Sequence, residues 1–121
     1  MAQSSAYKRK LSGSTDGKAI KITQTATAGD TIHTAIAGTT TGTFDEVWLW
    51  AYNGHTSDVT LTIEFGGATV PDQNIVVTIP YKSGLVPVVP GLILQNGMVV
   101  KAFASVANVV TIIGFVNAIT D

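Results

Sequence analysis

Apolar and polar side chains alternate along most of this chain from Lys18 onward, and that period of two is the period of a β-strand. The segment 59–65, VTLTIEF, shows the alternation most clearly. Similar segments, separated by glycine, asparagine, aspartate or proline turns, span residues 18–25, 32–37, 44–53, 75–79, 92–95, 98–104 and 109–116. No segment has the period of a helix, so the pattern predicts an all-β protein.

The predicted strands fit one domain, because 121 residues is an ordinary size for a single domain. About eight short strands with turns between them predict a single antiparallel β-sandwich or jelly-roll-like barrel over residues 18–121. Hydrophobic residues make up 45% of the chain and cysteine is absent, so we expect a core without disulfides.

The first 17 residues differ from the rest of the chain. They are polar, carry the consecutive cations Lys8, Arg9 and Lys10, and end in the turn-forming segment 12–17. This composition predicts an extended N-terminal arm at residues 1–17. Two alternatives remain open at this point. The arm is either a solvated tail or a segment that becomes ordered on a partner, with its cations against an acidic patch.

Turn chemistry suggests how some of the strands pair. We expect segment 44–53 to form a hairpin with segment 59–65, and segment 92–95 to form a second hairpin with segment 98–104 around Asn96-Gly97. Segment 44–53 is apolar on both faces, so we expect a central strand that is covered on both sides. Pro87 and Pro90 place their segment at an edge or bend, because proline donates no ladder hydrogen bond.

The sequence offers no recognisable catalytic apparatus. His33 and His55 are expected at the surface and apart, whereas a metal site needs three or four converging ligands. Most of the eight acidic residues fall in predicted turns or at strand ends, where solvation explains them. No nucleophile elbow or phosphate-binding loop is present. We therefore expect no enzyme activity, no cofactor and no metal.

The most distinctive side chains are three aromatic residues that share one face of segment 44–53: Trp48, Trp50 and Tyr52. Such a row fills a core layer, lies in a subunit contact, or stacks on a sugar ring. Nucleic acid is disfavoured because the interleaved residues are apolar rather than cationic, and because the net charge of −1 creates no basic field.

Charged residues form only 12% of the chain, about half of the usual ~25%. A surface with so little charge suits a protein that is largely covered by partners. No apolar run approaches the ~20 residues of a membrane helix, and the first ten residues lack the apolar core of a signal peptide. We therefore expect no membrane partner and synthesis in a cytoplasm.

Three stretches together resemble small structural proteins of tailed bacteriophages. They are MAQSSAYKRKLSGSTDGKAIKI, TIHTAIAGTTTGTFDEVWLWAYNGHTSDVTLTIEFGG and GLVPVVPGLILQNGMVVKAFASVANVVTIIGFVN. The resemblance covers nearly the whole chain and contains no catalytic motif. It implies a virion component, most like a capsid decoration (cement) protein on the outer surface of the phage head. It also implies the major capsid protein as partner, and a homo-oligomer with a trimer favoured.

Under this hypothesis Lys8, Arg9, Lys10, Trp48, Trp50 and Tyr52 are the candidate partner-binding residues. Two rival hypotheses remain. The first is a head fibre or other receptor- or glycan-binding module that uses the aromatic row. The second is a neck or tail structural protein, which is also all-β and oligomeric.

Overall fold

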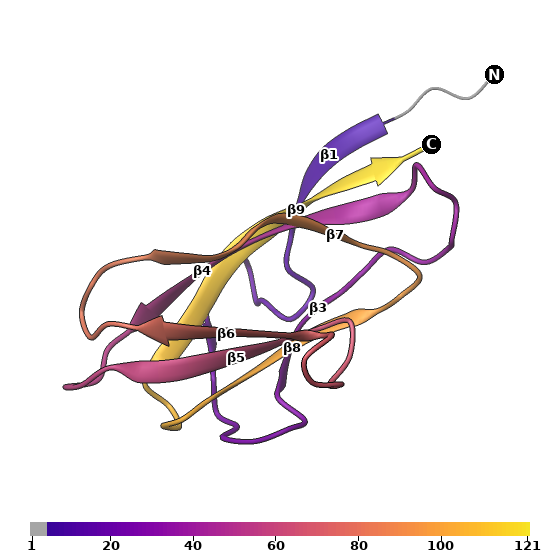
Figure 1. Ribbon diagram of the computed structural model, residues 1–121. Coiled ribbons are helices and arrows are strands. Elements are labelled where there is room, and N and C mark those ends of the chain that lie inside the picture. The colour runs from indigo at the N-terminus through magenta and orange to yellow at the C-terminus, as the bar shows by residue number, and fades with distance from the viewer. Residues whose placement is uncertain (1–4) are drawn as a thin grey trace.

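The computed structural model describes residues 5–121, and every regular element among them is a β-strand (Figure 1). The nine strands are β1 (Ser5–Lys10), β2 (Ile20–Lys21), β3 (Asp30–Thr34), β4 (Phe44–Asn53), β5 (Val59–Phe65), β6 (Asn74–Ile79), β7 (Val86–Leu94), β8 (Val99–Ala104) and β9 (Val110–Thr120). The expected all-β class is confirmed.

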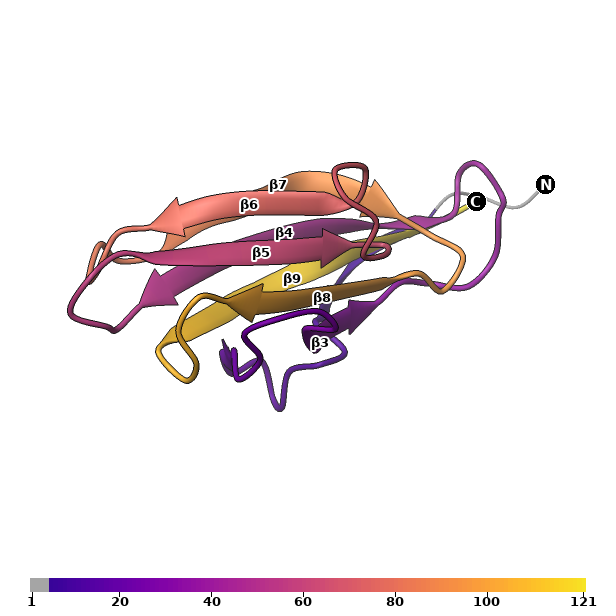
Figure 2. The same ribbon diagram turned by 60° about the horizontal axis from the view of Figure 1, so that its bottom comes forward.

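The strands form two antiparallel sheets packed face to face, which Figure 2 shows as two layers. Sheet A has the order β1-β9-β4-β7, with β2 also paired to β9, and sheet B has the order β3-β8-β5-β6. Apart from the neighbours β5 and β6, strands from β2 to β9 alternate between the sheets along the chain. This connectivity is that of a jelly roll, so the expected sandwich is confirmed, and the structure adds the strand order that the alternation alone does not predict.

The core lies between the two sheets and is built from alternate residues, as the period of two predicts. Each inward position of β4 is fully buried, and the inward positions of β5, β8 and β9 meet it from both layers. The buried side chains with the largest volumes include Leu11, Ile22, Ile32, Leu49, Leu61, Ile63, Ile79 and Ile112.

The described part of the predicted arm is an exposed strand on the edge of sheet A. All six residues of β1 are exposed, and they pair with the end of β9 from Ser5 opposite Thr120 to Lys10 opposite Phe115. Beyond β1 the chain turns inward, because Leu11 is 1% exposed within the core. Within residues 11–17, Leu11 and Ser14 are buried against the sandwich and the other five residues are exposed. Residues 1–4 lie outside the described part.

Both hairpins expected from the turn residues are wrong. β4 belongs to sheet A and β5 to sheet B, so the segment between them crosses from one layer to the other. β7 and β8 are separated in the same way, although Asn96 and Gly97 have the positive φ values, 63° and 66°, that a tight turn needs. The physical reason is that turn geometry is local, whereas a strand's layer depends on all the apolar faces together. β4 pairs with β9 and β7, and β5 pairs with β8 and β6.

The expectation that β4 is covered on both sides is also wrong. β4 is central within sheet A, between β9 and β7, but sheet B covers only its inner face. The aromatic face of β4 points away from sheet B and is half-buried by its own neighbours in sheet A. This outer face carries the candidate site.

Candidate functional site

Three aromatic rings lie together on the outer face of sheet A. Trp48 and Trp50 alternate along β4, and Phe115 stands directly opposite Trp48 on β9. Their ring centroids are 6.5 Å apart for Trp48 and Trp50, 6.4 Å for Trp48 and Phe115, and 6.0 Å for Trp50 and Phe115. The ring planes deviate from parallel by only 17–28°. We call these three rings the aromatic platform.

Gly91 shows how the platform is oriented on the sheet. A Cβ atom at this position of β7 would lie 2.7 Å from Cζ2 of Trp48, and 3.0 and 3.1 Å from the two atoms bonded to Cζ2. Nearly equal distances to these three atoms place Gly91 beneath the face of the ring rather than at its edge. The indole of Trp48 therefore lies over β7, and its opposite face points away from the sheet. Because the three planes are nearly parallel, Trp50 and Phe115 have similar orientations.

Polar groups fix the edge of the platform. Trp48 Nε1 donates a hydrogen bond of 2.7 Å to Glu46 Oε1, and Asn117 Nδ2 donates to the same oxygen at 3.0 Å. The bonds from Asn117 and Trp48 hold the pKa of the Glu46 carboxyl below its usual value. The indole is thus held in one position next to an ionised carboxylate.

A cation from the N-terminal strand covers part of the platform. Lys8 Nζ lies 4.4 Å from the centroid of the Phe115 ring, within the range of a cation–π interaction. Among the candidate partner-binding residues, the structure therefore brings Lys8, Trp48 and Trp50 together. Phe115 is not among the candidates from the sequence, although its position in the alternating segment 109–116 is a signal that identifies it as a strand residue.

The other three candidates lie outside the platform. Tyr52 is on the same face of β4, but none of the ring contacts found among residues 5–121 joins it to the two tryptophans. Lys10 Nζ donates a hydrogen bond of 3.2 Å to the carbonyl of Ser14. The guanidinium of Arg9 lies 6.0 Å from the Tyr7 ring, a weak contact within β1.

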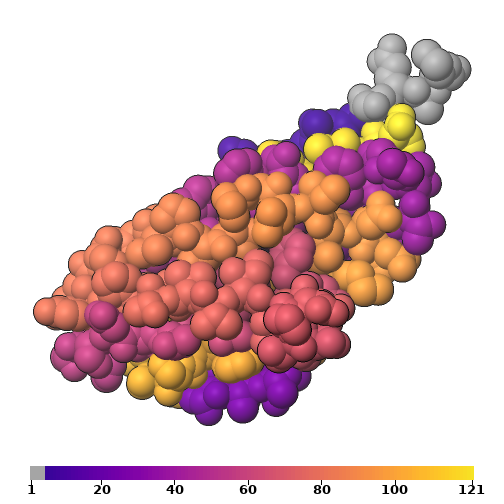
Figure 3. Space-filling view, viewed as in Figure 1, coloured from indigo at the N-terminus to yellow at the C-terminus, as the bar shows by residue number. Residues whose placement is uncertain are grey.

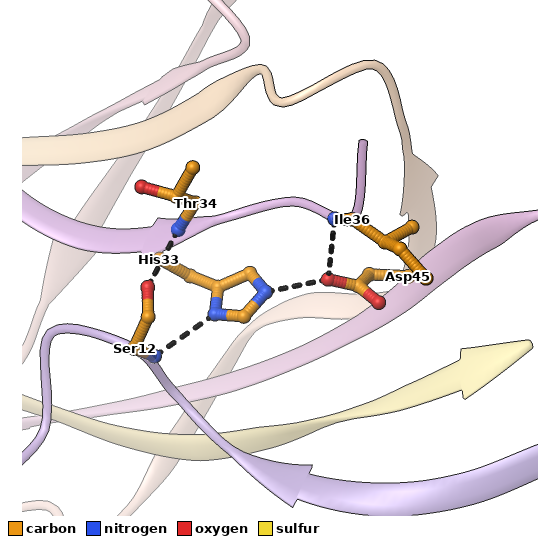
Figure 4. Close-up of polar contacts among 5 residues, drawn as sticks. All are labelled: Ser12, His33, Thr34, Ile36 and Asp45. Atoms are coloured by element: carbon orange, nitrogen blue, oxygen red, sulfur yellow. Dashed lines mark hydrogen bonds and ion pairs between the residues drawn. The ribbon is translucent and has the colours of Figure 1, made fainter. Parts of the chain in front are cut away.

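A second polar cluster lies inside the fold, where the N-terminal segment, β3 and β4 meet (Figure 4). His33 Nε2 is 2.7 Å from Asp45 Oδ2, and the backbone N–H of Ser12 donates to His33 Nδ1 at 3.0 Å. The backbone N–H of Ile36 also donates to Asp45 Oδ2 at 3.1 Å. His33 and Asp45 are only 5% and 2% exposed, so the expectations of a surface histidine and a solvated aspartate are wrong here.

The hydrogen bonds assign the proton on His33. A backbone N–H can only donate, so Nδ1 must accept with its lone pair, and the ring proton is on Nε2. Nε2–H then donates to Asp45, and the imidazole in this geometry is neutral. Both ring nitrogens are engaged. Ser12 contributes its N–H to the ring, while its hydroxyl oxygen accepts from the N–H of Thr34 at 2.7 Å. The cluster therefore joins three segments rather than activating a serine.

Two further acids, Glu64 and Asp30, organise the segment that leads into β3, and the burial of Glu64 corrects the expectation of solvated acids. Glu64 on β5 is 3% exposed and accepts hydrogen bonds from the Thr27 hydroxyl and, at 2.7 Å, from the N–H of Gly29. Asp30 accepts from the hydroxyl and N–H of Thr23 and from the N–H of residue 24. Burial raises the pKa of Asp30, but these hydrogen bonds outweigh it and hold the pKa below its usual value.

Residues 5–121 contain neither a cluster of candidate metal ligands nor a helix that could span a membrane. No group of three or more histidine, aspartate or glutamate side chains there is arranged to hold a metal ion. Within the same range, no helix has the length and hydropathy needed to cross a membrane. No protein-family model, curated protein or solved structure matches the chain.

Proposed function

We propose that this chain is a virion structural protein of a tailed bacteriophage, a capsid decoration protein that binds the outer surface of the head and stabilises it. The aromatic platform is the observation that carries the proposal. It presents partly exposed aromatic surface on the outer face of sheet A, away from sheet B, with Lys8 over the Phe115 ring. The phage-like sequence stretches supply the identity of the partner, the major capsid protein.

The platform suits protein docking because aromatic residues are enriched in the buried centres of protein interfaces. The Trp48 ring is already held by its packing against Gly91 and by its hydrogen bond to Glu46. Binding therefore orders few side chains, which lowers the entropic cost of association. Each ~100 Å² of apolar surface buried contributes roughly 2.5 kcal/mol before that cost is subtracted.

The cations of β1 extend the proposed contact. Lys8 lies at the platform itself, and Arg9 and Lys10 follow it on the same fully exposed strand. Carboxylates on the capsid surface would attract this strand and set the orientation of docking. Because such contacts are exposed, we expect attachment to weaken as the salt concentration rises.

Stabilisation would be mechanical. A decoration protein binds where capsid subunits meet and adds buried area across joints that internal pressure opens. Many copies, whether bound singly or as homo-oligomers, add their contributions around the shell. The location in this proposal is the capsid surface, after synthesis in the host cytoplasm.

The test measures attachment to heads assembled from a phage genome that lacks this gene. Trp50→Ala removes one ring of the platform and should reduce occupancy on these heads at least about tenfold, a loss of roughly 1.4 kcal/mol. The matched control is Phe103→Ala, which removes a half-buried aromatic ring from β8 in sheet B. Deleting residues 2–10 should also weaken attachment. Equal occupancy for Trp50→Ala and the wild type would refute docking through the platform.

One observation favours a second candidate, a glycan-binding module. The platform combines ring faces with adjacent hydrogen-bonding groups on Glu46 and Asn117, and sugars stack on aromatic rings while their hydroxyls need such partners. Glycan-array binding that Trp50→Ala abolishes, with no attachment to heads, would establish this function instead. Localisation at the portal or tail would indicate a neck or tail protein.

A further inference from the structure

The free edge of β6 differs from the other edges of the two sheets. Unpaired edge strands are templates for pairing with another chain, and proteins usually protect them with prolines, charges or bulges. β7 carries Pro87 and Pro90 and two register shifts, and β3 has a register shift next to its pairing with β8. β1 carries three consecutive cations.

β6 has none of these protections. Its sequence, NIVVTI, contains no proline and no charge, and its register against β5 is continuous from Asn74 to Ile79. Val76, at its centre, is 62% exposed. The side of the molecule seen in Figure 3 is formed largely by the segments from β6 to β7, and two more exposed apolar residues, Tyr81 and Leu85, lie in the loop that joins them.

The backbone of β6 is correctly oriented to accept another strand. The carbonyl of Gln73 accepts a hydrogen bond of 2.7 Å from the N–H of Phe65 on β5, and the register continues with Ile75 opposite Ile63 and Val77 opposite Leu61. Because alternate residues of a strand point to opposite edges, Val76 and Thr78 direct their N–H and C=O groups to the free edge.

We propose that the free edge of β6 binds β6 of a second copy of this chain, antiparallel and about a two-fold axis through Val76, so that sheet B continues across both copies. The partner is a second copy of this chain because β6 is complementary to itself in this arrangement. This register pairs Val76 with Val76 and Asn74 with Thr78 on the outer face, and Ile75 with Val77 on the inner face. Each pair is apolar with apolar or polar with polar.

The charged residues on either side of β6 also fit this two-fold arrangement. Between Gly66 and Val100 the chain carries only Asp72 and Lys82, one before β6 and one after it. Antiparallel pairing brings the beginning of one β6 next to the end of the other, so each aspartate approaches the lysine of the second copy. A register shifted to centre on Val77 would place Pro80, which lacks an N–H, opposite Asn74, and is therefore less favourable.

Solution mass and crosslinking test the proposal. The wild type should approach twice its 12.6 kDa as its concentration rises in sedimentation or light-scattering measurements. Val76→Lys places two like charges opposite each other at the axis and should weaken this association at least about tenfold. The control, Met98→Lys, changes a 42% exposed residue in the turn before β8 and should leave the association unchanged.

Cysteine variants test the register without depending on the lysine variant. The chain has no cysteine, so Val76→Cys provides a single thiol that should form a disulfide-linked dimer. Thr78→Cys should not, because its two copies would lie about 13 Å apart along the strands. A wild-type monomer at all concentrations, an oligomer unaffected by Val76→Lys, or equal crosslinking of both cysteine variants would overturn the proposal.

Discussion

Replacing His33 by leucine should destabilise the fold through the aspartate that remains. In the wild type, Asp45 accepts hydrogen bonds from His33 Nε2–H and from the N–H of Ile36, while its second oxygen, Oδ1, is buried without a hydrogen-bond partner. His33→Leu removes the stronger of the two donors. It also removes the acceptor of the Ser12 N–H. A carboxylate that is 2% exposed would then keep a single backbone donor.

The size of the effect follows from this loss. Because His33 is neutral, it gives Asp45 a hydrogen bond rather than an ion pair, and leaving a buried polar group without its partner costs roughly 1–3 kcal/mol, with charged groups at the upper end. This is a large fraction of the roughly 5–15 kcal/mol by which domains are stable. Adding Asp45→Asn to His33→Leu removes the buried charge but keeps an oxygen that accepts from Ile36. The double variant should therefore be more stable than His33→Leu alone, whereas Asp45→Asn alone should destabilise the wild type.

Urea unfolding of the four proteins, followed by circular dichroism, measures the free energies of this cycle. Nitrogen NMR of the imidazole checks the premise, since it should show His33 protonated at Nε2 and unprotonated at Nδ1. Two results would refute this role of Asp45. One is that His33→Leu lowers the free energy of unfolding by less than about 1 kcal/mol. The other is that Asp45→Asn lowers it equally in the wild type and in His33→Leu.

Three other predictions follow from single contacts. Gly91→Ala should reduce stability by roughly 1–3 kcal/mol and change the tryptophan fluorescence, since its φ is 74° and its Cβ would meet the Trp48 ring; an unchanged emission spectrum would contradict the ring orientation. Gly114→Ala should cost more than about 3 kcal/mol in thermal unfolding, because its Cβ would lie 2.0 Å from the backbone oxygen of Trp48. Asp30 has a lowered pKa in the fold, so its stabilising contribution is complete above its unfolded value of about 3.8 and is lost as the pH falls through the folded pKa; Asp30→Asn should flatten this part of the acid-unfolding curve.

The alternation in the sequence was sufficient to predict the class of fold and most strand positions, because it reports directly which side of a strand faces the core. It could not predict pairing. The Asn96-Gly97 turn has the expected local conformation, yet β7 and β8 lie in different sheets. Turn geometry is local, whereas the choice of layer depends on all the apolar faces together.

The candidate site was likewise predictable from the sequence only in part. The shared face of Trp48 and Trp50 could be read from their spacing, but Phe115 comes from a strand 65 residues further along the chain than Trp50. The sequence did not predict the burial of His33, because histidine and aspartate side chains are usually expected to be exposed to solvent. Only the fold shows that Ser12 and Asp45 provide both hydrogen bonds that its ring needs.

The place of β9 in sheet A has a consequence for how the protein is made. β9 is paired on one edge with β4 and on the other with β1 and β2, so sheet A cannot be completed until residues 110–120 have been synthesised. Until then the edges of β1 and β4 that later bind β9 are unpaired. Folding must wait for these distant contacts, which makes it slow and exposes the nascent chain to aggregation. Loss of β9 would separate the N-terminal strands β1 and β2 from the rest of sheet A.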